Sequence, residues 1–303
     1  MKRMNLLFLG GRQSGKTTFI TRTLYEAVHH TPEWLNLQFS IHNELIPGAI
    51  QGNFNALENR RSPGPMHHVS EGEICTLHVK KKHIFWFSVL MELFQKLFLW
   101  KPMTELGGLQ IRIFEMSIEN PSLGQWLLDH SAPRTPLGVI LVADPFAVGK
   151  TCESHHTPAI NAVVDRMVDR FEQIYVNNPE TRLPVSVATI VSKAETFAKM
   201  QENVLRYVDS STLAASRRAL RDTDGLYTDN YLLNDILTRQ SSEIASVLEN
   251  YDGNFVNILQ NEFRHVTYFW AGHQPIHDGN SSICRLTSPL LPLLWLLGAE
   301  MDF

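Results

Sequence analysis

The feature that most constrains the fold of this chain is a glycine loop close to its start. Gly10 is followed by four residues and then by Gly15-Lys16-Thr17, which fits the phosphate-loop pattern G-x-x-x-x-G-K-S/T. The pattern stands in the context that it requires, after an apolar run of strand length and before a helix predicted over Lys16–His29. This spacing predicts a strand–loop–helix unit that binds the phosphates of a nucleotide.

The residue types of this loop suit the chemistry of phosphate. Successive backbone N–H groups form an anion cradle, to which the helix N-terminus adds positive dipole. Lys16 is expected to reach the β- and γ-phosphates, and the Thr17 hydroxyl to ligate Mg²⁺, which usually keeps most of its waters. The predicted phosphate-binding residues are Gly10, Gly11, Arg12, Gln13, Ser14, Gly15, Lys16, Thr17 and Thr18.

Composition describes an ordinary globular protein. The chain has 303 residues, of which 44% are hydrophobic and 19% charged, so we interpret residues 1–303 as a single domain with a substantial core. The net charge of −4 offers no argument for a nucleic-acid partner, which would call for a basic face. The cysteines, at 75, 152 and 284, lack metal-type spacing. Isolated thiols, and a start that leaves no room for a signal peptide, predict the cytoplasm.

Strand and helix patterns alternate after the glycine loop. This alternation predicts an α/β fold with a doubly wound, mostly parallel sheet, the architecture of P-loop nucleotide-binding proteins. Ligand is then expected beyond the carboxyl ends of the strands. Strands are predicted at 6–9, 74–80, 109–116, 136–143, 183–191 and 265–270, and helices at 16–29, 160–175, 195–207, 211–221, 234–251 and 290–297.

Two stretches depart from this alternation. Residues 31–73 are punctuated by Gly, Pro and Asn and show little periodicity, and a loop of this length in a compact domain is often functional. Residues 83–101 form an apolar insertion of membrane-span length, but Glu92, Gln95 and Lys96 lie along one side of a helix. An amphipathic helix that docks on the protein's own core is favoured, and a partner groove or a membrane surface stays open.

The order of motifs resembles a Ras-like GTPase of the translation-factor class. In that family a base-reading loop, Asn/Thr-Lys-x-Asp, follows the fifth strand, and residues 192–195 (SKAE) stand in that place here. The resemblance implies that Ser192 and Lys193 belong to the base site and that Glu195 accepts two hydrogen bonds from guanine. It also implies that Ala271, in the loop after the last strand, presents its N–H to guanine O6. The implied ligands are GTP or GDP with Mg²⁺.

More narrowly, the chain is similar to bacterial double-GTPase domains of conflict and antiphage systems. The likeness consists of the phosphate loop at the N-terminus, the strand that ends in Ala-Asp-Pro at 143–145, the SKAE loop and the terminal SPLLPLLWLLG. It implies a switch protein whose output passes through a partner or effector protein in trans, because this chain carries no recognisable effector domain.

The second switch of that family, Asp-x-x-Gly, is altered here. Glu115 stands for the Asp and Ile118 for the Gly. The resemblance implies that Glu115 holds a magnesium-bound water. In the family the glycine N–H bonds the γ-phosphate, so Ile118 supports nucleotide binding better than hydrolysis. Hydrolysis would be in-line attack of water on the γ-phosphate, with Glu119 orienting the water and Arg61, or its neighbour Arg60, as an internal arginine finger.

Three functions stay open at this point. The first is a slow or partner-dependent GTPase switch, the second a nucleotide-loaded scaffold that recruits a partner, and the third a P-loop ATPase, favoured only if the SKAE match is accidental. For the magnesium ligand of the first switch the candidates are Ser70 and Thr76. Adjacent histidines such as His29-His30 point in different directions on a regular element, so no metal is assigned to them.

Overall fold

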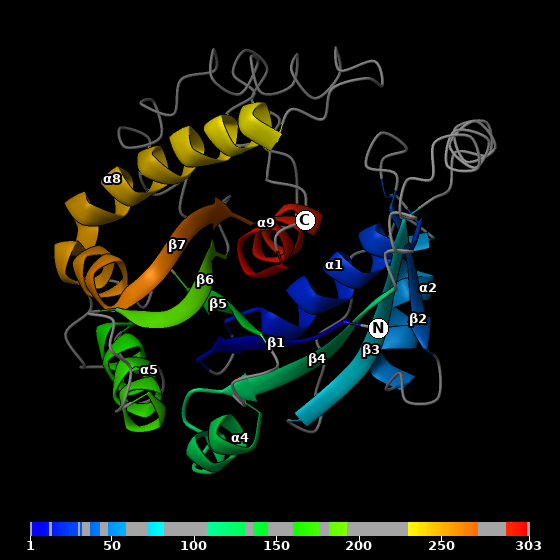
Figure 1. The fold of residues 1–303 in the computed structure, drawn as a ribbon, viewed down its shortest axis with the longest axis horizontal. Helices are drawn as coiled ribbons and strands as arrows, with labels where there is room; N and C mark the ends of the chain where they lie inside the picture. The colour runs from blue at the N-terminus through cyan, green and yellow to red at the C-terminus, as the bar shows by residue number, and fades with distance from the viewer. Residues whose placement is uncertain are drawn as a thin grey trace, which may run out of the picture.

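The computed structural model describes residues 2–11, 14–29, 31, 37–42, 48–58, 72–81, 108–130, 136–144, 160–175, 182–192, 230–271 and 289–301. The strands in these ranges form one sheet, in the order β2-β3-β4-β1-β5-β6-β7 (Figure 1). The strands are β1 (Lys2–Gly10), β2 (Leu37–His42), β3 (Gly72–Lys81), β4 (Leu109–Ser117), β5 (Leu137–Ala143), β6 (Leu183–Val191) and β7 (Phe263–Trp270). The helices are α1 (Lys16–His29), α2 (Gly48–Glu58), α4 (Leu123–His130), α5 (Ile160–Ile174), α8 (Asn230–Glu262) and α9 (Leu290–Met301).

The sheet is mostly parallel. β1 pairs in parallel with β4 and β5, and the parallel pairing continues through β6 to β7. Among the described strands only β3 runs the other way, antiparallel to both β2 and β4. The predicted α/β class with a mostly parallel sheet is confirmed.

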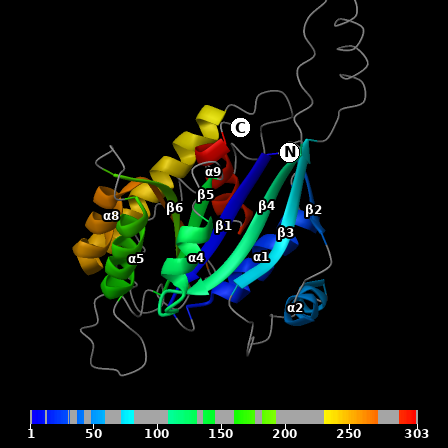
Figure 2. The same cartoon turned by 60° about the horizontal axis from the view of Figure 1, so that its bottom comes forward.

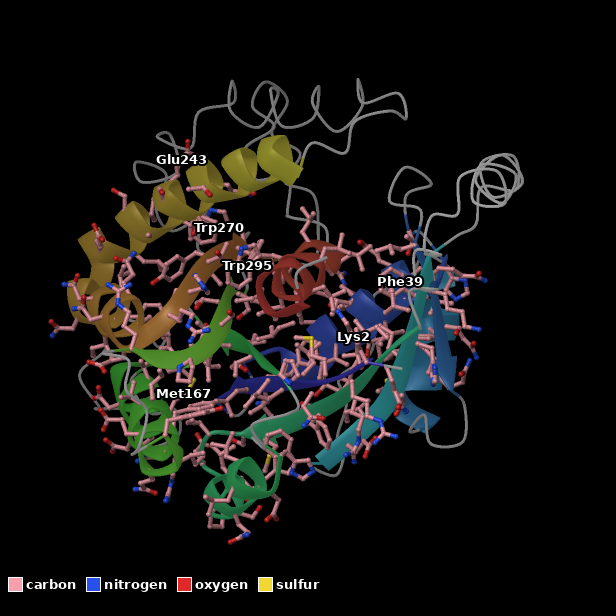
Figure 3. The ribbon with its side chains drawn as sticks, in the orientation of Figure 1. Lys2, Phe39, Met167, Glu243, Trp270 and Trp295 are labelled. Atoms are coloured by element: carbon pink, nitrogen blue, oxygen red, sulfur yellow. The ribbon has the colours of Figure 1, made fainter. Side chains whose placement is uncertain are left out.

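Helices cover both faces of this sheet, as the doubly wound prediction requires. Successive side chains of a strand point to opposite faces of the sheet. In β1, Leu7 and Leu9 therefore belong to one core cluster, and Leu6 and Phe8 belong to the other. The first cluster is completed by α4, α5 and α8, and the second by α1, α2 and α9. Figure 2 shows the two layers, and in Figure 3 the labelled Met167 of α5 and Trp295 of α9 lie on opposite sides of the sheet.

Several elements coincide with their predicted bounds. α1 and β6 begin and end at the predicted residues, and β5 begins one residue later than predicted. The other predicted strands extend by a few residues at one or both ends. α8 is longer than predicted at both ends and continues through Gly253, because Phe255, Val256 and Leu259 bury the next turns in the same core as Val247 and Leu248. The predicted helices at 195–207 and 211–221 and the apolar insertion at 83–101 lie outside the described residues.

The interpretation of residues 31–73 as one long irregular segment was wrong in part. The segment contains β2 and α2. β2 has the alternation of an edge strand, since Phe39 is buried between exposed Gln38 and Ser40. In α2, Ile50 and Phe54 lie one helical turn apart and bury into the core beside α1. The polar punctuation around both short elements hid these patterns.

Within the described ranges, no helix combines the length and the apolar character needed to cross a membrane.

Candidate nucleotide-binding site

The glycine loop lies where two parallel strands end side by side. β1 ends at Gly10, which is paired in register with Ser117 at the end of β4. In Figure 1 the arrowheads of both strands reach the same edge of the sheet, from which α1 starts back across one face. Gly15 adopts a φ of 93°, a left-handed conformation that glycine enters at little cost. The predicted strand–loop–helix unit is therefore present, and glycine at position 15 has a conformational reason.

The first turn of α1 opens toward this loop. Its first intrahelical bond runs from the Phe19 N–H to the Gly15 carbonyl, 2.9 Å apart, so the N–H groups of Thr17 and Thr18 precede the helical ladder. Lys16 is 8% exposed, and its ammonium donates to the carbonyl oxygens of Gly10 at 3.0 Å and Gly11 at 2.7 Å. The lysine is thus folded over the loop with its charge held at the place where phosphate is expected.

Close packing explains the glycine at position 10. A β-carbon there would lie 2.5 Å from the Val142 carbonyl oxygen and 2.9 Å from the Ser14 hydroxyl oxygen. Ser14 is itself 3% exposed, and its hydroxyl has no hydrogen-bond partner among the described residues. A backbone cradle that excludes a β-carbon, with an unsatisfied buried hydroxyl and a lysine ammonium beside it, suits a phosphate oxygen. Arg12 and Gln13, also predicted to bind phosphate, lie outside the described residues.

The predicted magnesium ligands are in direct contact. The Thr17 hydroxyl donates to Glu115 Oε1 over 2.6 Å. Glu115 is 7% exposed near the end of β4, so its carboxylate faces the first turn of α1. Among the residues that the structure describes, no cluster of three or more His, Cys, Asp or Glu gathers around a metal position. A hydroxyl and a carboxylate fit Mg²⁺ in the manner of nucleotide sites, where phosphate and water complete the shell.

The turn after β4 contacts the same loop. The Ile118 N–H donates to the Gly10 carbonyl at 3.3 Å. The candidate water-orienting Glu119 lies next in sequence, and its carboxylate accepts a 3.0 Å bond from the Ser117 hydroxyl. This contact holds the Glu119 carboxylate beside Ser117, the residue that is paired with Gly10.

Ser192, the first residue of the predicted SKAE loop, lies at the same end of the sheet. Ser192 follows β6, and both its N–H and its hydroxyl donate to the Ala143 carbonyl, at 2.9 and 3.1 Å. Its β-carbon lies 3.9 Å from the position that a β-carbon on Gly15 would take. Ser192 therefore joins the ends of β5 and β6 beside the phosphate loop. Lys193 and Glu195 lie outside the described residues, so their base-reading role stays a prediction.

One detail of the base prediction is wrong in this structure. The Ala271 N–H, expected to face guanine O6, instead donates to the Val191 carbonyl at 2.8 Å. The bond continues the pairing of β6 with β7 one residue beyond Trp270. A main-chain donor engaged in the sheet is not available to a base. For the Ala271 N–H to contact a base, its hydrogen bond to the Val191 carbonyl would first have to break.

Of the two candidates for the first-switch magnesium ligand, Ser70 and Thr76, the structure describes only Thr76. Thr76 lies inside β3 opposite Arg112, three residue pairs from Glu115, or about 10 Å along the strand. Its hydroxyl points to Glu73, with 3.4 Å between the oxygens. Thr76 is therefore not placed to share a metal with Thr17. Gly72, at the start of β3, is the residue paired with Glu115, while Ser70, Arg60 and Arg61 lie outside the described residues.

Sequence reasoning did not single out the Gly10 carbonyl. It accepts bonds from both the Lys16 ammonium and the Ile118 N–H, so it connects the loop lysine to the turn after β4. A main-chain acceptor leaves no signature in the side-chain pattern. The Ser117–Glu119 contact was not predicted either, although a serine two residues before an acid is a signal that could have indicated it.

Comparison with known proteins adds little to this geometry. No family model matches the chain, and no curated protein matches it. Among solved structures it is similar to the signal recognition particle receptor SRb-GTP/SRX complex from Chaetomium thermophilum, with a TM-score of 0.37 and 11% identity over 93% of this chain and 95% of that one.

Two further solved structures show a similar degree of likeness. The ADP-ribosylation factor-like protein Sar1 of Encephalitozoon cuniculi, in complex with GDP, gives a TM-score of 0.34 and 12% identity over 97% of this chain and 78% of that one. The GTP-bound GTPase-like domain of S. cerevisiae Ski7 gives 0.40 and 13%, over 98% and 49%.

Proposed function

We propose that this chain is a guanine-nucleotide-binding protein that holds GTP or GDP with Mg²⁺ and hydrolyses GTP slowly or only with a partner. The observation that carries the proposal is the 2.6 Å contact between Thr17 and Glu115. It brings the residue after the loop lysine and the acid of the neighbouring strand to one point beside the anion cradle. A hydroxyl and a carboxylate at that point would hold a magnesium ion and one of its waters against the terminal phosphates.

The Lys16 ammonium supplies the second part of the proposal. It is buried over the loop on the carbonyl oxygens of Gly10 and Gly11, and a bound phosphate would offer it charged oxygens in addition. Charge-assisted bonds of this kind are about twice as strong as neutral ones. Removing the ammonium should therefore weaken nucleotide binding while leaving the sheet intact.

The test compares two lysines of one strand–loop–helix unit. Binding of GTP with Mg²⁺ is measured by calorimetry for the wild type, Lys16→Ala and Lys2→Ala. Lys2 is exposed at the far end of β1, so its variant controls for the loss of a positive charge. We expect Lys16→Ala to lose roughly 2–3 kcal/mol of binding, or tens- to hundred-fold in affinity, and Lys2→Ala to bind as the wild type does. Unchanged affinity in Lys16→Ala would remove the proposal.

The choice of guanine over adenine is the finer part of the proposal, and its support is the sequence of the SKAE loop. A carboxylate placed to accept two N–H bonds rejects a base that leaves it unpaired. The wild type and Glu195→Asn are compared for binding of GTP, ATP and xanthosine triphosphate. Equal binding of ATP and GTP by the wild type would move the chain to the ATPase alternative.

A second candidate function is a nucleotide-loaded scaffold that recruits a partner. The observation in its favour is Ile118, whose side chain is 5% exposed and whose N–H bonds Gly10. This donor faces the loop carbonyl instead of a γ-phosphate. Chromatography of the nucleotide released from denatured protein bears on this choice. Retained GTP fits a scaffold or a GTPase that needs its partner, whereas GDP alone would favour a chain that hydrolyses GTP by itself.

The setting in which the protein works is proposed on sequence likeness alone. Resemblance to bacterial double-GTPase domains supports a role in a conflict or antiphage system, with the output carried by a partner protein. Phage plating on cells with the wild-type gene and with the Lys16→Ala gene tests this role. Equal plating on both would argue against it, whatever the affinity for nucleotide.

A further inference from the structure

The turn after β4 is held to the rest of the molecule at one residue by two kinds of contact. The Ile118 N–H donates to the Gly10 carbonyl at 3.3 Å. The Ile118 side chain is 5% exposed and belongs to the same apolar cluster as Met116, Leu123 and Leu127. Backbone and side chain therefore fix Ile118 in one place.

The acceptor of this bond is fixed as well. Gly10 is paired with Ser117 at the end of the sheet, and the space on its other side is closed by the Val142 carbonyl. The Lys16 ammonium bonds the same carbonyl oxygen. The Gly10 carbonyl thus cannot follow Ile118 if the turn moves.

The remainder of the turn is bonded internally. The Asn120 N–H donates to the Ser117 carbonyl at 3.0 Å, and the Leu123 N–H donates to the Asn120 carbonyl at 3.1 Å. The Asn120 side-chain oxygen accepts the Ser122 N–H at 2.8 Å. These bonds lead directly into α4, whose Leu123 and Leu127 are buried. The turn is a continuous structure from the sheet to the helix.

From these contacts we propose that residues 117–122 form a fixed wall of the phosphate site, which keeps one conformation whether a diphosphate or a triphosphate is bound. The inference rests on the proposed function and adds how that site is regulated. Turning the Ile118 N–H toward a γ-phosphate would break the Gly10 bond and expose a buried isoleucine. The exposure alone disfavours such a conformer roughly 10- to 100-fold. Any partner that distinguishes GTP from GDP must then do so through another part of the site.

Hydrogen exchange of single amides tests this wall. The full chain with Mg²⁺ is loaded either with GDP or with a GTP analogue that resists hydrolysis, and saturation is confirmed by calorimetry. We expect the amides of Ile118, Asn120 and Leu123 to exchange at rates that agree within about threefold between the two states. A change of about tenfold or more at Ile118 in the wild type would overturn the inference.

Two variants test whether the turn is held by Ile118 in particular or by the stability of the apolar cluster in general. Ile118→Ala removes the apolar side chain that anchors the turn but keeps the main-chain N–H, and Leu127→Ala removes a fully buried side chain of the same cluster in the last turn of α4. We expect exchange in the turn to become nucleotide-dependent in Ile118→Ala and to stay independent in Leu127→Ala. Nucleotide dependence in both variants would contradict the assigned role of Ile118.

The outcomes distinguish the inference from the proposed function. If neither nucleotide binds the wild type, the proposed function fails and the inference with it. If both bind and the turn responds to the γ-phosphate, the inference alone fails. Should Ile118→Ala not fold, the comparison of the two loaded wild-type states decides by itself.

Discussion

The Thr17 hydroxyl and the Glu115 carboxylate meet over 2.6 Å, which joins the first turn of α1 to the end of β4. Glu115 lies opposite Phe8 in the parallel pair of β1 and β4, two residue pairs before the strands end at Gly10 and Ser117. The carboxylate is therefore carried by the sheet and the hydroxyl by the helix. The resemblance places an aspartate at this position, and the glutamate found here reaches the Thr17 hydroxyl directly.

The first prediction is that Glu115 makes nucleotide binding dependent on Mg²⁺. Glu115→Gln keeps the size of the side chain and removes its charge, and groups of this kind are typically worth 10- to 100-fold in metal affinity. We expect the variant to bind GTP roughly tenfold or more weakly when Mg²⁺ is present and about as well as the wild type in excess chelator. Titration of a fluorescent nucleotide in both buffers measures the effect.

Glu119→Gln is the matched control for this experiment. Its carboxylate lies four residues further on and accepts the Ser117 hydroxyl, so the same change of charge is made without touching Thr17. It should keep the dependence on Mg²⁺. An equal loss of that dependence in both variants would mean that the effect is general electrostatics and not ligation at Glu115.

The second prediction concerns two adjacent glycines with opposite surroundings. A β-carbon on Gly10 would lie 2.5 Å from a main-chain oxygen of β5, whereas one on Gly11 would meet nothing within 4 Å. We expect Gly10→Ala to lose about 1–3 kcal/mol of unfolding free energy through overpacking, and Gly11→Ala to stay within about 0.5 kcal/mol of the wild type. Urea unfolding midpoints provide the measurement. Equal stability of the two variants would show that the loop relaxes around the added methyl group.

The sequence was informative where one segment determines its own structure. The bounds of α1 and β6 were predicted to the residue, because the loop pattern marks the start of α1 and the run 183–191 is apolar almost throughout. Thr17 was assigned to Mg²⁺ from the loop pattern, and Glu115 was assigned to a magnesium-bound water from the family resemblance. Their contact links positions 98 residues apart, so it could not be read from local spacing.

Features that depend on a neighbouring element could not be predicted. β2 is an edge strand of six residues, and its pattern is too short to distinguish from a loop until β3 is known to lie beside it. The Ala271 N–H was assigned to the base, but the pairing of β6 with β7 extends one residue further and engages it with Val191. The anchoring of Ile118 on Gly10 is a main-chain contact and has no sequence signal.

The third prediction is a loss of stability at alkaline pH through Cys75. Burial, with a smaller contribution from Glu73, raises the pKa of the Cys75 thiol from 9.0 to about 12. Above pH 9 the unfolded chain releases this proton and the folded chain keeps it, so the unfolding free energy falls as pH rises from 9 toward 12. One such group contributes a slope of up to about 1.4 kcal/mol per pH unit.

Cys75→Ala isolates this titration. The variant loses some packing at every pH, but its unfolding free energy should fall less steeply between pH 9 and 10 than that of the wild type. Burial also raises the pKa of Tyr268 above its ordinary value of 10.0, so a remaining slope is expected at higher pH. Urea unfolding at pH 8, 9 and 10 measures the difference, and parallel curves would show that the Cys75 thiol ionises alike in both states.

The last prediction concerns the rate of GTP hydrolysis. The Ile118 N–H bonds the Gly10 carbonyl, so this donor does not stabilise charge on the γ-phosphate, and one such donor is typically worth ~10²-fold or more in rate. We expect single-turnover hydrolysis by the chain alone at or below the unassisted level of small GTPases, roughly 10⁻⁴ s⁻¹. Glu119→Ala and Arg61→Ala are followed beside the wild type, with nucleotide binding confirmed for each. If the wild type is fast and Glu119→Ala removes the activity, the scaffold alternative is wrong and Glu119 is the catalytic residue. If all three proteins are equally inert while GTP stays bound, the charge that completes the site must come from a partner, or the protein acts as a nucleotide-loaded scaffold.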